Sequence, residues 1–196
     1  MKKQLLILGV AAIIGLSGCG KDTNNDTSSK GNKESTHAEM DHSKMDDRSM
    51  DHSMHSSSGE VPKDLKEAAN PAYMVGSQAI IKASHMEGMD GATATIVGAY
   101  DTIAYAVSYT PTTGGEMVKN HKWVIQQEIK DAGSEPLEPG TDVTIEADHM
   151  EGMKGASGKI DSAEKTTVYM VDYTPATGGE KVKNHKWVTE SELTAK

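Results

Sequence analysis

Apolar and polar residues alternate at matching places in two parts of the chain. Val143, Ile145 and Ala147 alternate with polar neighbours, and Ala79, Ile81 and Ala83 hold the corresponding positions further upstream. A period of two residues predicts a β-strand with one buried face. A second strand is predicted in each part by heavy side chains at every other position: Tyr105, Val107 and Tyr109, and Tyr169, Val171 and Tyr173.

These strands belong to a duplication with a constant offset of 64 residues. The sequence His-Met-Glu-Gly-Met at 85–89 returns at 149–153, and Asn-His-Lys-Trp-Val at 120–124 returns at 184–188. Because no gap is needed, we predict two copies of one small domain, at 74–130 and 138–194, with a linker at 131–137. Each copy has the order strand, Gly-rich turn, strand, strand and Gly-Gly loop.

The predicted fold class is therefore all-β, with two tandem small SH3-like (KOW-type) barrels after a disordered tether. Closure of each barrel would remove its exposed strand edges. Residues 61–73, which contain Asp64, Leu65, Glu67 and Ala68, are expected to form a short helical lead-in.

The tether is predicted at residues 19–60, which contain no aromatic residue and little that is apolar apart from Met. Such a segment cannot bury enough surface to offset its ordering entropy. Residues 37–55 nevertheless hold half of the 8 histidines and a third of the 12 methionines of the chain. The candidate metal ligands in it are His37, Met40, His42, Met45, Met50, His52, Met54 and His55.

Imidazole and thioether together are typical ligands of a soft ion such as Cu(I), and of Ag(I) by analogy, whereas Ca and Mg prefer oxygen. The sequence therefore predicts a Cu(I)-binding tether. Two alternatives stay open: a Zn or Ni site made from His and Asp, and a low-complexity spacer whose His and Met residues bind nothing.

The N-terminus has the features of an export signal. Lys2 and Lys3 precede an apolar stretch of about twelve residues, which is too short for a membrane span. The small residues before Cys19 resemble a bacterial lipobox, so residues 1–18 are predicted to be a lipoprotein signal peptide and Cys19 the lipidated (palmitate-bearing) residue. The predicted location is the extracytoplasmic face of the cell membrane, where the lipid anchors the protein.

Cys19 is the only cysteine in the chain. Its use for lipidation leaves no disulfide and no thiolate in the rest of the protein. Any soft-metal site must then use Met and His, and each imidazole must be neutral to bind.

Charge and motifs narrow the function class. The net charge of −9 opposes binding to nucleic acid. The sequence contains no Gly-x-Ser-x-Gly, no phosphate loop and no His-Glu-x-x-His, so we predict a protein that is not an enzyme.

The duplicated motifs supply further candidate ligands, as a second set beside the tether. We expect Gly152 to let Met153 fold back beside His149, which would give a pair of imidazole and thioether. The same residues can equally be core packing, with Met as an adaptable filler. The residues of this second set are His85, Met86, Met89, His149, Met150, Met153, His121 and His185.

Taken together, the lipobox, the His/Met tether and the two duplicated motifs resemble the YdhK family of Gram-positive surface lipoproteins. Within that family the chain is similar to copper-resistance lipoproteins, and this resemblance implies Cu(I) binding outside the membrane and protection of the cell. Whether copper is passed on to an exporter stays open.

A binding module of another class is the competing hypothesis. SH3-like barrels of exported proteins often contact peptidoglycan or peptides, and an aromatic groove would serve that function, with the tether as a spacer. The residues that could line it are Tyr105, Tyr109, Trp123, Tyr169, Tyr173 and Trp187.

Overall fold

The structure is a computed structural model that describes residues 56–196. The predicted signal peptide, Cys19 and the eight candidate ligands of the tether lie outside the described residues. Within 56–196, no helix is long and apolar enough to cross a membrane.

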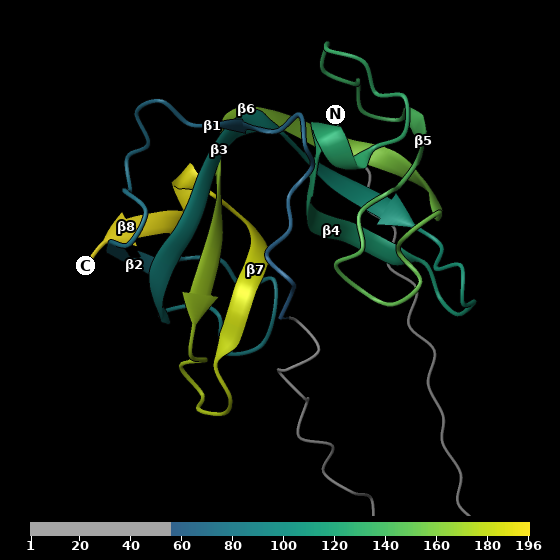
Figure 1. Ribbon diagram of the computed structural model, residues 1–196. Helices are drawn as coiled ribbons and strands as arrows, with labels where there is room; N and C mark the ends of the chain where they lie inside the picture. Colours follow the sequence, from purple (N-terminus) through teal and green to yellow (C-terminus); the bar gives the residue numbers. More distant parts are fainter. Residues whose placement is uncertain (1–55) are drawn as a thin grey trace, which may run out of the picture. The chain divides into compact units, whose positions relative to one another are not determined.

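The regular secondary structure of the described chain is almost all β-strand, so the predicted all-β class is confirmed (Figure 1). Two short 3-10 helices follow β4 and β7. The strands are β1 (Lys66–Glu67), β2 (Gln78–Ile81), β3 (Thr93–Tyr109), β4 (Val118–Ile125), β5 (Asp142–Thr144), β6 (Ser157–Tyr173), β7 (Val182–Thr189) and β8 (Leu193–Ala195), and the 3-10 helices are η2 (Gln126–Glu128) and η3 (Glu190–Glu192).

Two long strands, β3 and β6, are paired antiparallel along their whole length. The pairing is symmetric with respect to the duplication: Ala94 lies opposite Tyr173, and the equivalent residues of the other repeat, Gly158 and Tyr109, also lie opposite each other. Each 17-residue strand is long enough to pass from one half of the molecule into the other. The sequence repeat is therefore not the packing unit of this fold.

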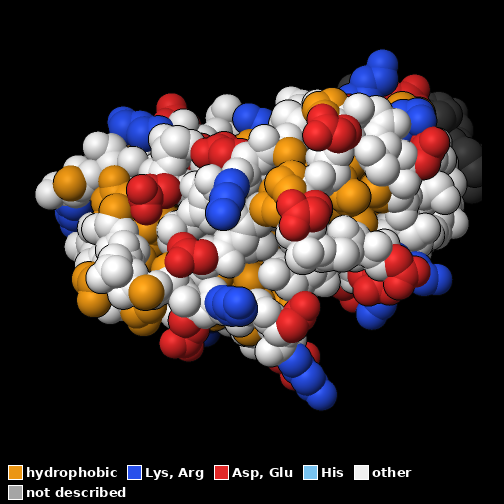
Figure 2. Space-filling view, turned by 90° about the horizontal axis from the view of Figure 1, so that it is seen from above, with side chains coloured by type: hydrophobic (Ala, Val, Ile, Leu, Met, Phe, Trp, Pro, Cys, Tyr) orange, Lys and Arg blue, Asp and Glu red, His pale blue; other side chains and the backbone are white. Residues whose placement is uncertain are grey.

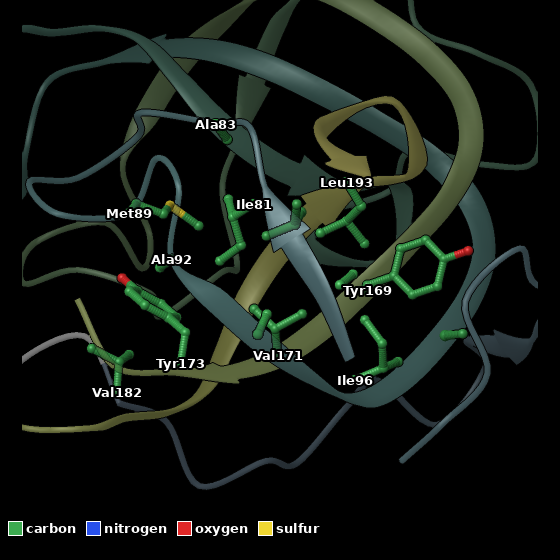
Figure 3. Close-up of a cluster of buried hydrophobic side chains, with 14 residues drawn as sticks. Ile81, Ala83, Met89, Ala92, Ile96, Tyr169, Val171, Tyr173, Val182 and Leu193 are labelled. Carbon is green, nitrogen blue, oxygen red and sulfur yellow. The ribbon is translucent and has the colours of Figure 1, made fainter. Parts of the chain in front are cut away.

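Two hydrophobic cores show how the repeats are exchanged. One core joins residues 79–99 of the first repeat to residues 169–193 of the second (Figure 3). The other core joins residues 103–129 of the first repeat to residues 145–160 of the second. Each core thus combines the first half of one repeat with the second half of the other.

The predicted alternation is confirmed inside these cores. Ala79 and Ile81 are fully buried in one core and Ile145 in the other. The tyrosines at 105, 109, 169 and 173 are buried as well, on one face of the long strands. A third cluster contains Trp123 and Trp187 together with residues of β3 and β6 that alternate with the core positions, such as Ala104 and Val168.

The strand pairing does not show the closed, SH3-like barrels that the sequence predicted. All eight strands belong to one sheet whose path runs from β5 through β6, β3 and β2 to β8 without closing. η3 connects β7 to β8, and these two strands do not pair with each other: β7 pairs with β6, and β8 pairs with β2.

The helical lead-in expected at 61–73 is also wrong. These residues form turns and β1, which pairs with the middle of β3 through Asp101 and Tyr100. The segment gains a backbone partner there, since the Ala68 N–H donates to the carbonyl of Ala99. It also buries Leu65 in the cluster around Trp123.

Candidate functional site

One cleft, with a volume of about 1490 Å³, collects residues from both repeats. All four histidines of the described chain line it, together with two of the candidate methionines. These residues are His85, His121, His149, His185, Met86 and Met150. The sequence predicted all six as candidate ligands but gave no reason for them to share one cleft.

The two histidines of the duplicated His-Met-Glu-Gly-Met motif each bind a carboxylate from the opposite repeat. His85 Nε2 lies 2.7 Å from Glu192 Oε1, and His149 Nε2 lies 2.8 Å from Glu128 Oε1. η2 and η3 place these two glutamates. Because the repeats exchange their second halves, each glutamate reaches the histidine of the other repeat.

Each carboxylate also holds a tryptophan of that other repeat. The indole Nε1 of Trp123 donates to Glu192 Oε2 at 2.8 Å, and the indole of Trp187 donates to Glu128 Oε2 at 3.0 Å. A backbone N–H three residues upstream also donates to each carboxylate: that of Thr189 to Glu192, and that of Ile125 to Glu128. Each carboxylate is thus fixed by three donors.

These contacts decide the charge of both glutamates. Burial alone would raise the pKa of Glu128, but the charge and hydrogen bond of His149, together with the N–H groups of Ile125 and Trp187, outweigh it and lower the pKa. For Glu192, burial is outweighed in the same way, chiefly by the hydrogen bond and charge of His85, and the pKa is lowered. Both carboxylates are therefore ionised at neutral pH.

An ionised carboxylate only accepts hydrogen bonds, so Nε2 of His85 and His149 must be the protonated nitrogen. In the neutral ring, Nδ1 then carries the lone pair. In both residues Nδ1 is buried and has no hydrogen-bond partner within residues 56–196. The side chains are only 11% and 10% exposed.

His121 is the third imidazole of this neighbourhood. Its burial, followed by the charges of His149 and His85, lowers its pKa to about 4, against a smaller opposing effect of Glu128. His121 is therefore neutral at physiological pH. Its ring packs edge-on against Tyr109, and the equivalent His185 packs the same way against Tyr173.

His121 and His185 do not share a strand face with the tryptophan two positions later. β4 and β7 contain register shifts at these positions. As a result Trp123 and Trp187 lie in the third cluster, whereas His121 and His185 line the cleft.

The candidate methionines separate into two groups. Met86 and Met150 line the cleft, and Met150 is 40% exposed. Met89 and Met153 are 0% exposed and belong to the hydrophobic cores. Figure 3 shows Met89 beside Ile81, Ala92 and Tyr173. The expected return of Met153 to His149 is thus replaced by core packing, which satisfies an apolar thioether without a metal.

No group of three or more His, Cys, Asp or Glu side chains in the described part of the chain is arranged to hold one metal ion. A site in the cleft would have to use fewer imidazoles, or imidazoles with thioethers. Both arrangements suit a soft ion of low coordination number better than one that needs several oxygen ligands.

The segment that leads to the tether meets the molecule at this cleft. Ser56, Ser57 and Ser58 contribute to its lining. The N–H of Ser57 donates to the carbonyl of Lys183 at 3.0 Å, and its hydroxyl donates to the carbonyl of Asn184 at 2.7 Å. Residues 56–60, which the sequence assigned to the disordered tether, are therefore held against β7.

Glu128 and Glu192 are not among the site residues that the sequence predicted. The signal was present, because both obey the offset of 64 residues and each follows its tryptophan by five positions. A carboxylate that recurs in both copies next to buried aromatic residues is a candidate for a specific role.

The aromatic groove of the competing hypothesis is not formed by the expected residues. All six of its tyrosines and tryptophans are buried, at 5% exposure or less. On the face seen in Figure 2, acidic and basic side chains are interspersed with apolar ones, so charge of one sign does not mark that face as a binding surface.

Known proteins match this chain both by family and over its full length. The sequence profile of a family described as "Protein of unknown function (DUF1541)" matches residues 75–126 and 139–190. The chain is 58% identical over 197 residues to "Uncharacterized protein YdhK" of Bacillus subtilis (strain 168), covering all of this chain and 90% of that protein.

Solved structures of YdhK from Bacillus subtilis are similar as well. A crystal structure at 2.00 Å resolution matches with a TM-score of 0.70 and 67% identity, over 76% of this chain and 99% of that one. A solution NMR structure of the YdhK C-terminal domain matches with a TM-score of 0.60 and 72% identity, over 63% and 93%. No copper function appears in these names, so the finer resemblance to the copper-resistance lipoprotein CopL stays a prediction.

Proposed function

The chain belongs to the DUF1541 family, and from this premise we propose that it is a lipid-anchored protein of the extracytoplasmic membrane face that binds and sequesters Cu(I). The observation that carries the proposal is the convergence of four histidines and two methionines on one cleft. Ser56, which lines that cleft, directly follows in the sequence a segment in which His and Met are again concentrated.

The ligand chemistry supports a soft monovalent ion. Thioethers are poor ligands for Ca and Mg, whereas Cu(I) accepts both thioether and imidazole. Lysines and carboxylates line the cleft in nearly equal number, so its net charge does not favour a divalent cation. Selection would therefore come from the ligand type.

The proposed location rests on the N-terminal sequence. A signal peptide of the lipoprotein type that ends just before Cys19 would place the mature protein outside the cytoplasmic membrane, held there by lipid. Bound copper would be kept away from membrane transporters by mass action, without catalysis. Such sequestration would contribute to copper resistance.

An anaerobic Cu(I) titration against a competing chromogenic chelator tests the proposal. The protein is a soluble chain that begins at Gly20 and keeps the whole tether. It is compared with a variant lacking residues 37–55, and with a control in which Ser43, Ser49 and Ser53 are changed to Ala. We expect several tightly bound ions for the parent and the control, and far fewer for the deletion.

Failure of all three proteins to compete with the chelator would overturn the copper proposal. Equal stoichiometry in the parent and the deletion would instead show that the tether is not the main binding segment.

A further inference from the structure

We propose that the cleft is itself a Cu(I) site in which His85 and His149 bind through Nδ1, with Glu192 and Glu128 as positioning residues supplied by the opposite repeats. This inference rests on the proposed function and assigns it a site in the folded part of the chain. It also gives the exchange of the repeats a functional consequence, because neither repeat alone supplies a histidine together with its carboxylate.

Two imidazole nitrogens on the cleft lack a hydrogen-bond partner within residues 56–196. A buried acceptor without a partner is rare in folded proteins and costs free energy. Here two such atoms, Nδ1 of His85 and Nδ1 of His149, occur at equivalent places on the same cleft. A soft cation that binds these lone pairs would remove both penalties.

The opposite nitrogen of each ring, Nε2, is held by a carboxylate. Histidines that bind metals commonly donate their other ring N–H to a carboxylate, which fixes the tautomer and the ring orientation. Glu192 and Glu128 make this contact at 2.7 and 2.8 Å. Each glutamate is in turn fixed by an indole and a backbone N–H, so the imidazoles are oriented before any ion arrives.

Further nitrogen and sulfur ligands line the same cleft. His121 lines the same cleft as His85 and His149. The same cleft contains the thioethers of Met86 and Met150. The lining of the cleft therefore offers an imidazole and two thioethers as further ligands for an ion held by Nδ1 atoms.

The competing explanation is purely structural: the pairs of His and Glu would only fasten the exchanged halves together. The variants His85→Gln and His149→Gln separate the two, because the amide nitrogen of Gln can replace Nε2 as the donor to the carboxylate. The substitution keeps the fastening contact and removes Nδ1. Met117→Ser, which removes an exposed thioether outside the cleft, is the matched control.

The experiment uses the chain from Gly20 with the eight tether ligands changed to Ser, so that only cleft ligands remain. The imidazoles are labelled with ¹⁵N, and two-bond ¹H–¹⁵N correlations are recorded with and without Cu(I). We expect a protonated Nε2 and a free Nδ1 for His85 and His149, and a large shift of both Nδ1 resonances when Cu(I) is added. The single Gln variants assign the signals.

In the chelator competition, we expect the double Gln variant to bind Cu(I) at least about tenfold more weakly than its parent, and Met117→Ser to bind as the parent does. Glu192→Gln should weaken binding about tenfold and give a mixture of His85 tautomers. A structural role alone would lower the melting temperature and leave affinity and tautomer unchanged.

Two outcomes overturn the inference. One is Cu(I) binding by the tether-substituted chain with both Nδ1 resonances unmoved. The other is no Cu(I) binding by this chain while the parent with its tether binds, in which case the proposed function stands and the cleft site fails. Absence of binding by both proteins would reject the two proposals together.

Discussion

Substitution of Glu128 by Gln should destabilise the protein strongly, because it changes a buried carboxylate that accepts three hydrogen bonds. His149 donates to one oxygen, and Trp187 and the backbone of Ile125 donate to the other. The side chain is only 8% exposed, so water cannot replace a lost acceptor. In either orientation, the NH₂ group of Gln faces at least one of these donors.

The magnitude follows from the contacts. A buried donor left without an acceptor costs about 1–3 kcal/mol. Loss of the negative charge weakens the hydrogen bonds that remain and adds about 1 kcal/mol. We therefore expect Glu128→Gln to lower the free energy of unfolding by about 2–4 kcal/mol, which for a chain of this size lowers the melting temperature by about 6–15 °C.

The sign of the pH dependence is also fixed. The pKa of Glu128 is lower in the folded protein than its usual value, so its stabilising contribution is present above the unfolded-state pKa of about 4.3. The contribution is lost as the pH falls through the folded-state pKa. The difference in stability between wild type and Glu128→Gln should thus be full at pH 7 and shrink in acid.

Urea unfolding of the soluble chain at several pH values measures this difference. Glu151→Gln serves as the control, since Glu151 is exposed and belongs to the duplicated motif, and it should change stability by less than about 0.5 kcal/mol. A Glu128→Gln protein that unfolds within about 0.5 kcal/mol of wild type at pH 7 would refute the reasoning.

Three further predictions use the same unfolding assay. Because the pKa of His121 is low in the folded protein, the unfolded chain binds a proton between about pH 6.5 and 4 that the folded chain does not bind. The free energy of unfolding should therefore fall by on the order of 2–3 kcal/mol as the pH drops through this range, and His121→Gln should flatten this slope. Gly152→Ala should lower the free energy of unfolding by about 2–4 kcal/mol, because the new Cβ would come within 2.6 Å of a threonine of the opposite repeat. Gly155 also has a positive φ but has open space around it, so Gly155→Ala should lower the free energy of unfolding by only about 1–2 kcal/mol. Equal losses for the two variants would argue against this contact. Met153→Ala truncates a core residue and should lower the free energy of unfolding by about 2–5 kcal/mol, whereas Met150→Ala should lower it by less than about 1 kcal/mol. The reverse order would contradict the assignment of Met153 to the core.

The local structure of the strands could be predicted because alternation depends only on neighbouring residues. Ile81, Ile145 and the buried tyrosines are all on the expected faces. The exchange of halves could not be predicted, because two near-identical repeats bury the same residues whether each packs on itself or on its partner. Continuity of β3 and β6 through 17 residues decides between these arrangements, and alternation does not reveal where a strand fails to turn.

Only part of the candidate site could be predicted, again because motifs report local sequence and not which distant residues meet in the fold. Motif spacing identified the histidines, but not which methionine of each motif faces the cleft. Met89 and Met153 follow a glycine turn and enter the cores, whereas Met86 and Met150 stay at the cleft. Glu128 and Glu192 were missed because their partners are distant in sequence, and only the exchanged fold brings them to His149 and His85.

X-ray absorption at the copper K-edge tests the central claim most directly, on the soluble chain from Gly20 loaded anaerobically with copper. Because Cys19 is the only cysteine, any sulfur ligand in this protein must be a methionine thioether. The account predicts Cu(I) of low coordination number with both nitrogen and sulfur ligands, and a larger share of nitrogen once the tether methionines are changed to Ser. A coordination shell of oxygen and nitrogen without sulfur would contradict soft-metal binding by this protein.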